Sequence, residues 1–304
     1  MTNQDIMNYC IDTLKGVGAD KGSCSLNVSE KKELNVEVGE MTLFRTTFNT
    51  NLGISLIKDQ KKSSTSINKT DKESINTAIE SLIEMAAASQ PDEAYDISES
   101  QPTKSFTKGE MSPDLDKMYT SMDEFVDYVK LKYPQIILET AILDFTNTRS
   151  YFQNTNGVSF KVNEGIYGFS PMFTSKKGKD TSSFNYTFFS ALNINKPIHQ
   201  YGTIDTLLRQ STEQIHTQKI KDKFIGNIIV TPDCIGDFLG FVMSDISDGK
   251  MISGNSLYKE MLNNKIASSK LSISSCPVSK EISDGYFITN DGYIAENSVI
   301  IDKG

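Results

Sequence analysis

The sequence has no tryptophan, two histidines and four cysteines among its 304 residues. The cysteines form no CxxC pair and no cluster with the spacing of a metal site. They are Cys10, Cys24, Cys234 and Cys276. The N-terminus lacks a basic stretch followed by a continuous apolar run, so it does not resemble a signal peptide. We therefore expect a cytoplasmic protein with reduced thiols that serve as small core residues.

The two histidines are too isolated to predict a metal site. His199 follows Pro197, and His216 lies on the polar side of a helix predicted over residues 203–219. Neither has a second histidine three or four residues away, as a zinc-binding pair on a helix requires. We interpret both as surface or hydrogen-bonded residues. The sequence also lacks a GxSxG elbow, a P-loop and a GxGxxG motif.

Long apolar runs and excess positive charge are absent as well. No run approaches the ~20 residues needed to cross a bilayer. The formal net charge is −8, and the tight basic clusters, at 61–62 and 176–179, lie at predicted turns. A nucleic-acid surface needs a basic face that neutralises phosphates. The composition therefore argues against direct DNA or RNA binding.

The periodicity predicts an α+β fold with an N-terminal domain over residues 1–90. Apolar residues recur at helical spacing over residues 4–17 and again over Lys72 to Ala88, where Asp71 is a candidate N-cap. Between the helices, alternating segments predict an antiparallel meander of short strands: Cys24–Ser29, Glu33–Val38, Thr42–Asn49, Gly53–Lys58 and Ser63–Ile67. We expect both helices to cover one face of this sheet.

Residues 91–120 are predicted to be a linker, because they are rich in Ser, Glu, Lys, Pro and Asp and show little periodicity. A β-rich C-terminal domain with a few helices is expected over 121–304. It begins with a helix at Ser121–Lys132 and includes a hairpin turn at Asn156-Gly157. The chain stops on a turn-like pair after Ile301, so we expect the natural protein to extend beyond Gly304 and this domain to be incomplete.

The segment from Gly226 to Gly249 predicts a strand followed by an amphipathic helix, an arrangement that often carries catalytic residues. One helical stripe is apolar and is expected to face the core; it consists of Ile235, Phe238, Leu239, Val242, Met243 and Ile246. The polar side holds Asp237, Gly240 and Asp245. A metallopeptidase helix would instead need two imidazoles one turn apart and a carboxylate beside them.

Several stretches together resemble the TldD/PmbA family, once called modulators of DNA gyrase and linked to peptide maturation. They are the first helix with its Gly-Ala-Asp end (18–20), the meander, the hairpin "QNTNGV" (153–158), and "GNIIVTPDCIGDFLGFVMSDIS" (226–247) followed by "SGNSL" (253–257). The similarity spans nearly the whole chain through diffuse motifs. The PmbA (TldE) branch is closer than the TldD branch.

The resemblance implies a cytosolic peptidase system in which TldD-type and PmbA-type chains pair. TldD-type chains carry an HExxxH zinc motif on this helix. Laid on the present sequence, its first histidine falls on Gly240, its glutamate on Phe241 and its second histidine on Asp245, so no zinc ligand and no catalytic residue is retained. We therefore expect a non-catalytic subunit without a cofactor of its own. Its expected partners are a TldD-like HExxxH subunit that holds the zinc, or a second copy in a homodimer, together with an extended peptide substrate.

Two alternatives remain at this stage. The chain could be a hydrolase with an unfamiliar site at the helix start, where Cys234 or Asp237 would act; a helix N-terminus lowers a thiol pKa, but no base is visible nearby. It could also be a regulatory protein-binding factor related to DNA gyrase modulation.

Overall fold

The computed structural model describes residues 1–220 and 222–304. Its helices and strands follow in the order α1 (Asn3–Gly16), β1 (Lys21–Glu37), β2 (Glu40–Lys58), β3 (Lys61–Ile67), α2 (Lys72–Ala88), β4 (Lys104–Lys108), α3 (Leu115–Lys132), β5 (Ile136–Asn154), β6 (Ser159–Lys177), β7 (Asp180–Thr181), β8 (Asn185–Tyr186), β9 (Phe189–Ala191), η1 (Ile198–Gln200), α4 (Ile204–Glu213), α5 (Pro232–Asp245), α6 (Asp248–Ile252), β10 (Ile273–Ser275) and β11 (Ser298–Ile301). This content confirms the predicted α+β class.

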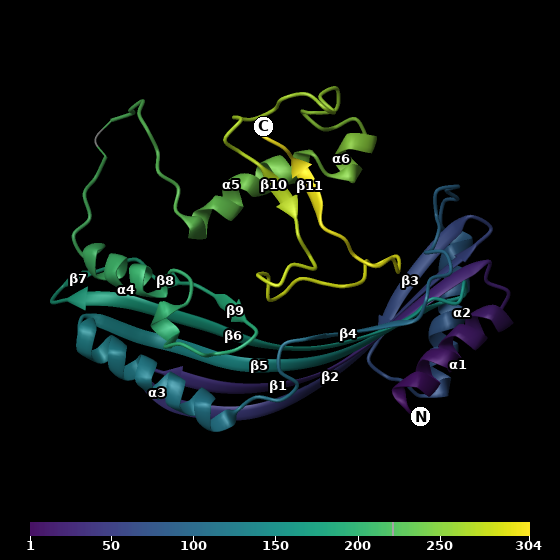
Figure 1. Cartoon of the computed structure of the whole chain (residues 1–304), viewed down its shortest axis with the longest axis horizontal. Helices are drawn as coiled ribbons and strands as arrows, with labels where there is room; N and C mark the ends of the chain where they lie inside the picture. Colours follow the sequence, from purple (N-terminus) through teal and green to yellow (C-terminus); the bar gives the residue numbers. More distant parts are fainter. Residues whose placement is uncertain (221) are drawn as a thin grey trace.

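One long sheet organises the chain, with the strand order β3-β2-β1-β5-β6-β4. All neighbours along it are antiparallel except β4, which runs parallel to β6. Figure 1 shows the long strands as a curved sheet, with α3 toward one end and α1 and α2 at the other. The short neighbours β7, β8 and β9 pair with β6.

The meander has fewer and longer strands than predicted. Four predicted short strands are two continuous ones, β1 and β2, of 17 and 19 residues. The polar stretch Glu30–Lys32 continues the strand because it pairs with β2 on one side and with β5 on the other. Ladder hydrogen bonds on both edges therefore hold an extended conformation that local composition alone does not favour.

The segment 91–120 is not the structureless linker that we predicted. It contains β4, and α3 begins at Leu115, where the side chain of Asp114 accepts a hydrogen bond from the backbone N–H of Lys117 at 3.0 Å. The single sheet also joins strands from residues 1–90 with strands from residues 121–304. Whether these two ranges are separate domains remains a prediction.

Two apolar cores lie on the same face of the sheet. Near one end, Cys24 and Leu26 of β1 pack with α1 and α2, which confirms that both helices cover one face. Near the other end, Leu34 and Val36 of β1 pack with α3 and α4. All four residues occupy even positions of one strand, and alternate residues of a strand share a face.

The opposite face of the sheet meets the C-terminal part of the chain. There Phe152 of β5 and Phe160 of β6 pack with Ile288 and Ile294. In Figure 1 this part, which contains α5, α6, β10 and β11, lies above the sheet. The predicted strand at the start of the 226–249 segment is wrong: residues 222–231 form no regular secondary structure. Ile225 and Ile229 are almost fully exposed there, because no strand of the described chain lies beside them to form a ladder.

Candidate functional site

The helix on which the sequence resemblance places the TldD-type zinc motif is α5. Pro232 occupies its first turn, where a missing N–H costs nothing. The predicted apolar stripe is present in the sequence of α5, but the prediction that it faces a core is wrong. No residue of α5 is buried, and Ile235 and Phe238 are 43% and 59% exposed. The helix packs mainly against the short helix α6 and does not lie on the sheet.

The three positions that match the zinc motif do not fit a zinc ion. Gly240 has no side chain, and Phe241 is an 80% exposed ring without a ligand atom. Asp245 accepts a hydrogen bond from Nζ of Lys250 at 2.6 Å and a longer one from the backbone N–H of Leu257. The Lys250 hydrogen bond lowers the pKa of Asp245 below its usual value. Within residues 1–220 and 222–304, no group of three or more His, Cys, Asp or Glu side chains is placed to hold a metal ion.

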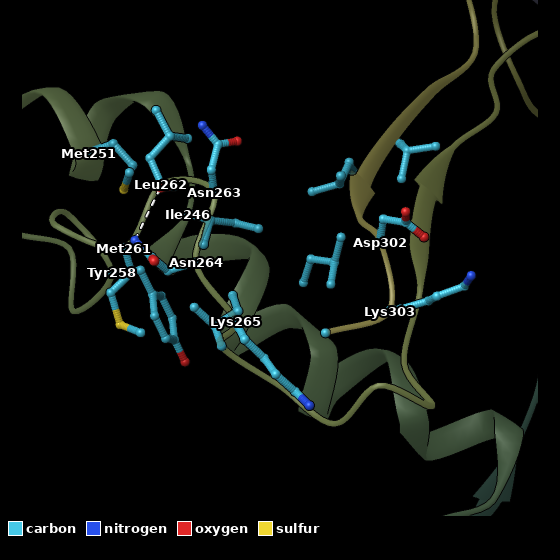
Figure 2. A pocket seen from close by; sticks show the side chains of 15 residues that line it. Ile246, Met251, Tyr258, Met261, Leu262, Asn263, Asn264, Lys265, Asp302 and Lys303 are labelled. Carbon is cyan, nitrogen blue, oxygen red and sulfur yellow. Dashed lines mark hydrogen bonds between the residues drawn. The ribbon is translucent and has the colours of Figure 1, made fainter.

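A pocket of about 660 Å³ lies where α5 and α6 face the strand β11. Figure 2 shows Tyr258, Met261 and Leu262 on one side of it and Asp302 and Lys303 on the other. Most of its other lining side chains are apolar. The lining contains no nucleophile paired with a base, so this pocket can hold an apolar group but offers no evident catalytic chemistry.

The two histidines are not part of α5. His199, in η1, stacks on the ring of Tyr128 at 3.7 Å between centroids, beside a network in which Asp205 accepts hydrogen bonds from Tyr128 and Tyr133. Burial lowers the pKa of His199. His216 is exposed and lies beyond α4, because that helix ends at Glu213 rather than continuing to residue 219. The structure does not bring the histidines together.

The cysteines divide into buried and accessible ones. Cys10 and Cys24 are buried in the core under α1 and α2, as predicted for small core residues. Cys276 is partly exposed. Cys234 is exposed in the first turn of α5, so the prediction that it is a core residue is wrong, and Asp237 in the next turn is exposed as well.

A charged cluster on the face of the sheet opposite the helices was not predicted. Glu33 is 4% exposed, and its carboxylate forms ion pairs with Arg45 at 2.7 Å and Lys31 at 3.0 Å and accepts a hydrogen bond from the side chain of Asn35 at 2.9 Å. Lys31 also reaches Asp144 of β5 at 3.3 Å. The alternation of Lys31, Glu33 and Asn35 marks one strand face, but the contribution of Asp144 requires knowledge of the register between β1 and β5.

The two carboxylates of this cluster have opposite pKa shifts. Burial alone would raise the pKa of Glu33, but hydrogen bonds from Asn35 and Lys31 and the nearby Arg45 charge lower it overall. For Asp144 burial dominates and raises the pKa, although Lys31 opposes the shift. The folded protein therefore favours an ionised Glu33 and disfavours an ionised Asp144.

The Glu33→Gln variant is expected to lower the free energy of unfolding by about 1–3 kcal/mol at pH 7, because Arg45 and Lys31 lose their ion-pair partner and Asn35 loses a charged acceptor. Folding lowers the pKa of Glu33 below its ordinary value of 4.5. The stabilisation by Glu33 is therefore fully present at pH values above 4.5, and it is lost as the pH falls through the lower pKa of the folded state. The difference between variant and wild type should therefore shrink in acid. Urea unfolding between pH 3 and pH 7 measures it.

Asp144→Asn is the matched control. Since the raised pKa of Asp144 means that folding disfavours its charge, this variant should be neutral or slightly more stable at pH 7. If both variants lost the same free energy of unfolding, this would contradict the assignment of Glu33 as the carboxylate whose ionised form stabilises the fold.

A second, smaller pocket lies farther along the same face of the sheet. It has a volume of about 220 Å³ and is enclosed by the sheet on one side and residues 286–290 on the other. Polar residues of the strands, including Asn27 and Ser150, line it together with Phe287. Burial raises the pKa of Glu164, which also lines this pocket and has one carboxylate oxygen without a hydrogen-bond partner.

Two family profiles match the chain. Residues 24–86 match the PmbA/TldA metallopeptidase domain 1, and residues 225–304 match the PmbA/TldA metallopeptidase C-terminal domain. The second range includes α5 and the pocket of Figure 2. No curated protein matches the chain significantly.

Solved structures share the fold over almost the whole chain. TldE from Thermococcus kodakarensis is 15% identical with a TM-score of 0.75, and the match covers 98% of this chain and 68% of that one. A protein from Bacteroides thetaiotaomicron described as a proposed modulator of DNA gyrase is 19% identical with a TM-score of 0.79, over 99% and 70% of the two chains. A similarly described protein from Thermotoga maritima is 13% identical with a TM-score of 0.73, over 100% and 69%.

Proposed function

Since this chain belongs to the PmbA/TldD metallopeptidase family, we propose that it is a non-catalytic, PmbA/TldE-type subunit of a cytosolic peptidase system. In this proposal an HExxxH-bearing partner of the TldD type supplies the zinc and the catalytic glutamate. The present chain supplies part of the surface that holds an extended peptide for proteolysis or maturation.

The observation that carries the proposal is the state of α5. The sequence resemblance aligns the TldD-type zinc motif with this helix, and the three aligned positions hold a glycine, an exposed phenylalanine and an aspartate hydrogen-bonded to Lys250. A zinc site needs at least three ligand side chains around the metal. Neither Gly240 nor Phe241 can provide one, so the residues of α5 support a role without metal chemistry.

Zinc analysis of the purified 304-residue chain tests the first half of the proposal. After dialysis against a mild chelator we expect less than about 0.1 zinc per chain, because a site with one carboxylate and no imidazole does not retain the metal. One zinc per chain would contradict the proposal. His199→Ala, His216→Ala and Cys234→Ser would then identify the ligands, since their zinc content would fall.

The same preparation should hydrolyse no unstructured peptide alone. Mixed with an HExxxH-bearing family member from the same genome, it should increase the peptide hydrolysis of that partner. Activity of this chain by itself that Cys234→Ser abolishes would support the alternative of a hydrolase site at the start of α5.

A further inference from the structure

The outer edge of β2 is unpaired over more than half of its length. The edge strand β3 pairs with β2 only from Leu52 to Lys58. From Glu40 to residue 51, β2 pairs with β1 on its inner side, and no strand of the described chain lies on its outer side. Proteins usually protect such an edge with lysine, proline or a covering element. Residues 40–51 contain no lysine and no proline.

Two large aromatic side chains project from this unpaired stretch. Phe44 and Phe48 are 50% and 75% exposed. They pair with Leu34 and Glu30 of β1, so both lie on the face of the sheet that carries the helices. The side chain of Thr46 lies between them on the same face.

A pocket adjoins the edge on this side. It has a volume of about 480 Å³ and lies between β2 and the first turns of α3. Its apolar and aromatic lining residues are Leu34, Met41, Leu43, Phe44, Leu115 and Tyr119. A side chain from a strand added beside β2 would enter this pocket if it lay opposite Phe44.

We propose that a second copy of this chain pairs with the free edge of β2, antiparallel and about a two-fold axis at Thr46. Residues directly opposite each other in an antiparallel pair share a face, so a symmetric pairing must match positions of equal parity. The register centred on Thr46 places Phe48 of each copy opposite Phe44 of the other. Each Phe48 then fills the pocket beside Tyr119 of the other copy.

The sequence of the edge supports this self-pairing over other occupants. Cross-strand aromatic pairs stabilise antiparallel sheets, and here the symmetry forms the pair twice. In this register Arg45 lies opposite Thr47, so no like charges meet. The register ends at Thr42, where β2 has a bulge opposite β1. An unrelated extended peptide could use the same backbone groups, but it would not account for the symmetric spacing of the two phenylalanines.

The mass of the protein in solution tests the inference. Sedimentation equilibrium should give twice the chain mass of 33.8 kDa. Phe48→Lys should raise the dimer dissociation constant at least about 100-fold, since each dimer loses two aromatic contacts and gains charges on its edge. The matched control is Phe188→Lys, at a ring that is 62% exposed outside β2, and it should leave the dimer intact. A monomeric wild type, or a dimer that survives Phe48→Lys, would overturn the inference.

Cross-linking locates the two-fold axis directly. In a Cys234→Ser background, which removes the exposed thiol, Thr46→Cys should form a disulfide between copies on mild oxidation, because the two positions face each other. Thr50→Cys, on the same face, should not, since its two positions would lie far apart along the strands. Cross-linking of Thr50→Cys but not of Thr46→Cys would exclude this register.

This inference does not rest on the proposed peptidase role. Zinc content and peptide hydrolysis test that role, whereas mass and cross-linking test the edge. If the edge pairs only with the HExxxH partner, the wild type alone will be monomeric, and the self-pairing is refuted while the proposed function stands.

Discussion

Phe169→Ala is expected to lower the free energy of unfolding by about 3–5 kcal/mol. Phe169 is fully buried at the centre of the core between β6 and α3. Its ring meets that of Phe125 edge to face at 5.0 Å and that of Phe189 at 5.6 Å. These two partners come from two different elements, α3 and β9, so the structure cannot close around the void by moving one side chain, and the cavity adds to the lost burial.

Chemical denaturation with two-state analysis measures this effect. Phe188→Ala removes the same ring from a site that is 62% exposed, and it should change the free energy of unfolding by no more than about 0.5 kcal/mol. A loss below 1 kcal/mol for Phe169→Ala would mean that this core is loosely packed.

Gly165→Ala is expected to destabilise the protein by more than about 3 kcal/mol, or to prevent folding, although it adds a single methyl group. A Cβ atom at this position would overlap with the carbonyl oxygen of Glu110 and approach Cζ of Phe145 to 2.7 Å. The obstacle includes backbone from the segment that follows β4, which is tied to β6 by a hydrogen bond from the Tyr167 hydroxyl to Glu110 at 2.8 Å. Removing this overlap therefore requires a shift of the backbone around Glu110 and not only of a side chain.

Gly240→Ala is the matched control, because its Cβ would meet no atom within 4 Å. In the interior of an exposed helix, alanine in place of glycine should raise stability by up to about 1 kcal/mol. Thermal unfolding followed by circular dichroism compares the two variants. If Gly165→Ala were as stable as the wild type, residues 109–110 would not cross β6 as described.

The parts of the fold that the sequence predicted are those governed by local patterns. The helix from Lys72 to Ala88 was predicted at its observed bounds, because helical periodicity and an N-cap both mark it. Asp71 accepts the expected hydrogen bond from the backbone N–H of Ser74 at 2.9 Å. The hairpin turn at Gly157 also follows from its own residues, with a positive φ that favours glycine.

The incorrect predictions concern pairing between distant segments. Strand β1 continues through polar residues because two neighbours hold it, and β4 is a strand because β6 accepts it in parallel register. Neither partner is visible from local composition. The apolar stripe of α5 was recognised as a pattern, but a pattern does not state what covers it. The same limit applies to the site: the zinc motif positions come from a sequence match, whereas the Glu33 cluster needs the register of three strands.

The pairing of β1 with β5 also constrains the order of events as the chain is made. Gly22 and Thr155, which are hydrogen-bonded at the end of this pairing, are 133 residues apart. The hairpins β1–β2 and β5–β6 can each form from neighbouring residues, but the seam between them closes only after β5 has left the ribosome. Until then the edge of β1 that later pairs with β5, from Ser23 to Glu37, has no partner strand. Because contacts between distant segments form slowly, we expect the pairing of β1 with β5 to be the slow step in folding of the nascent chain.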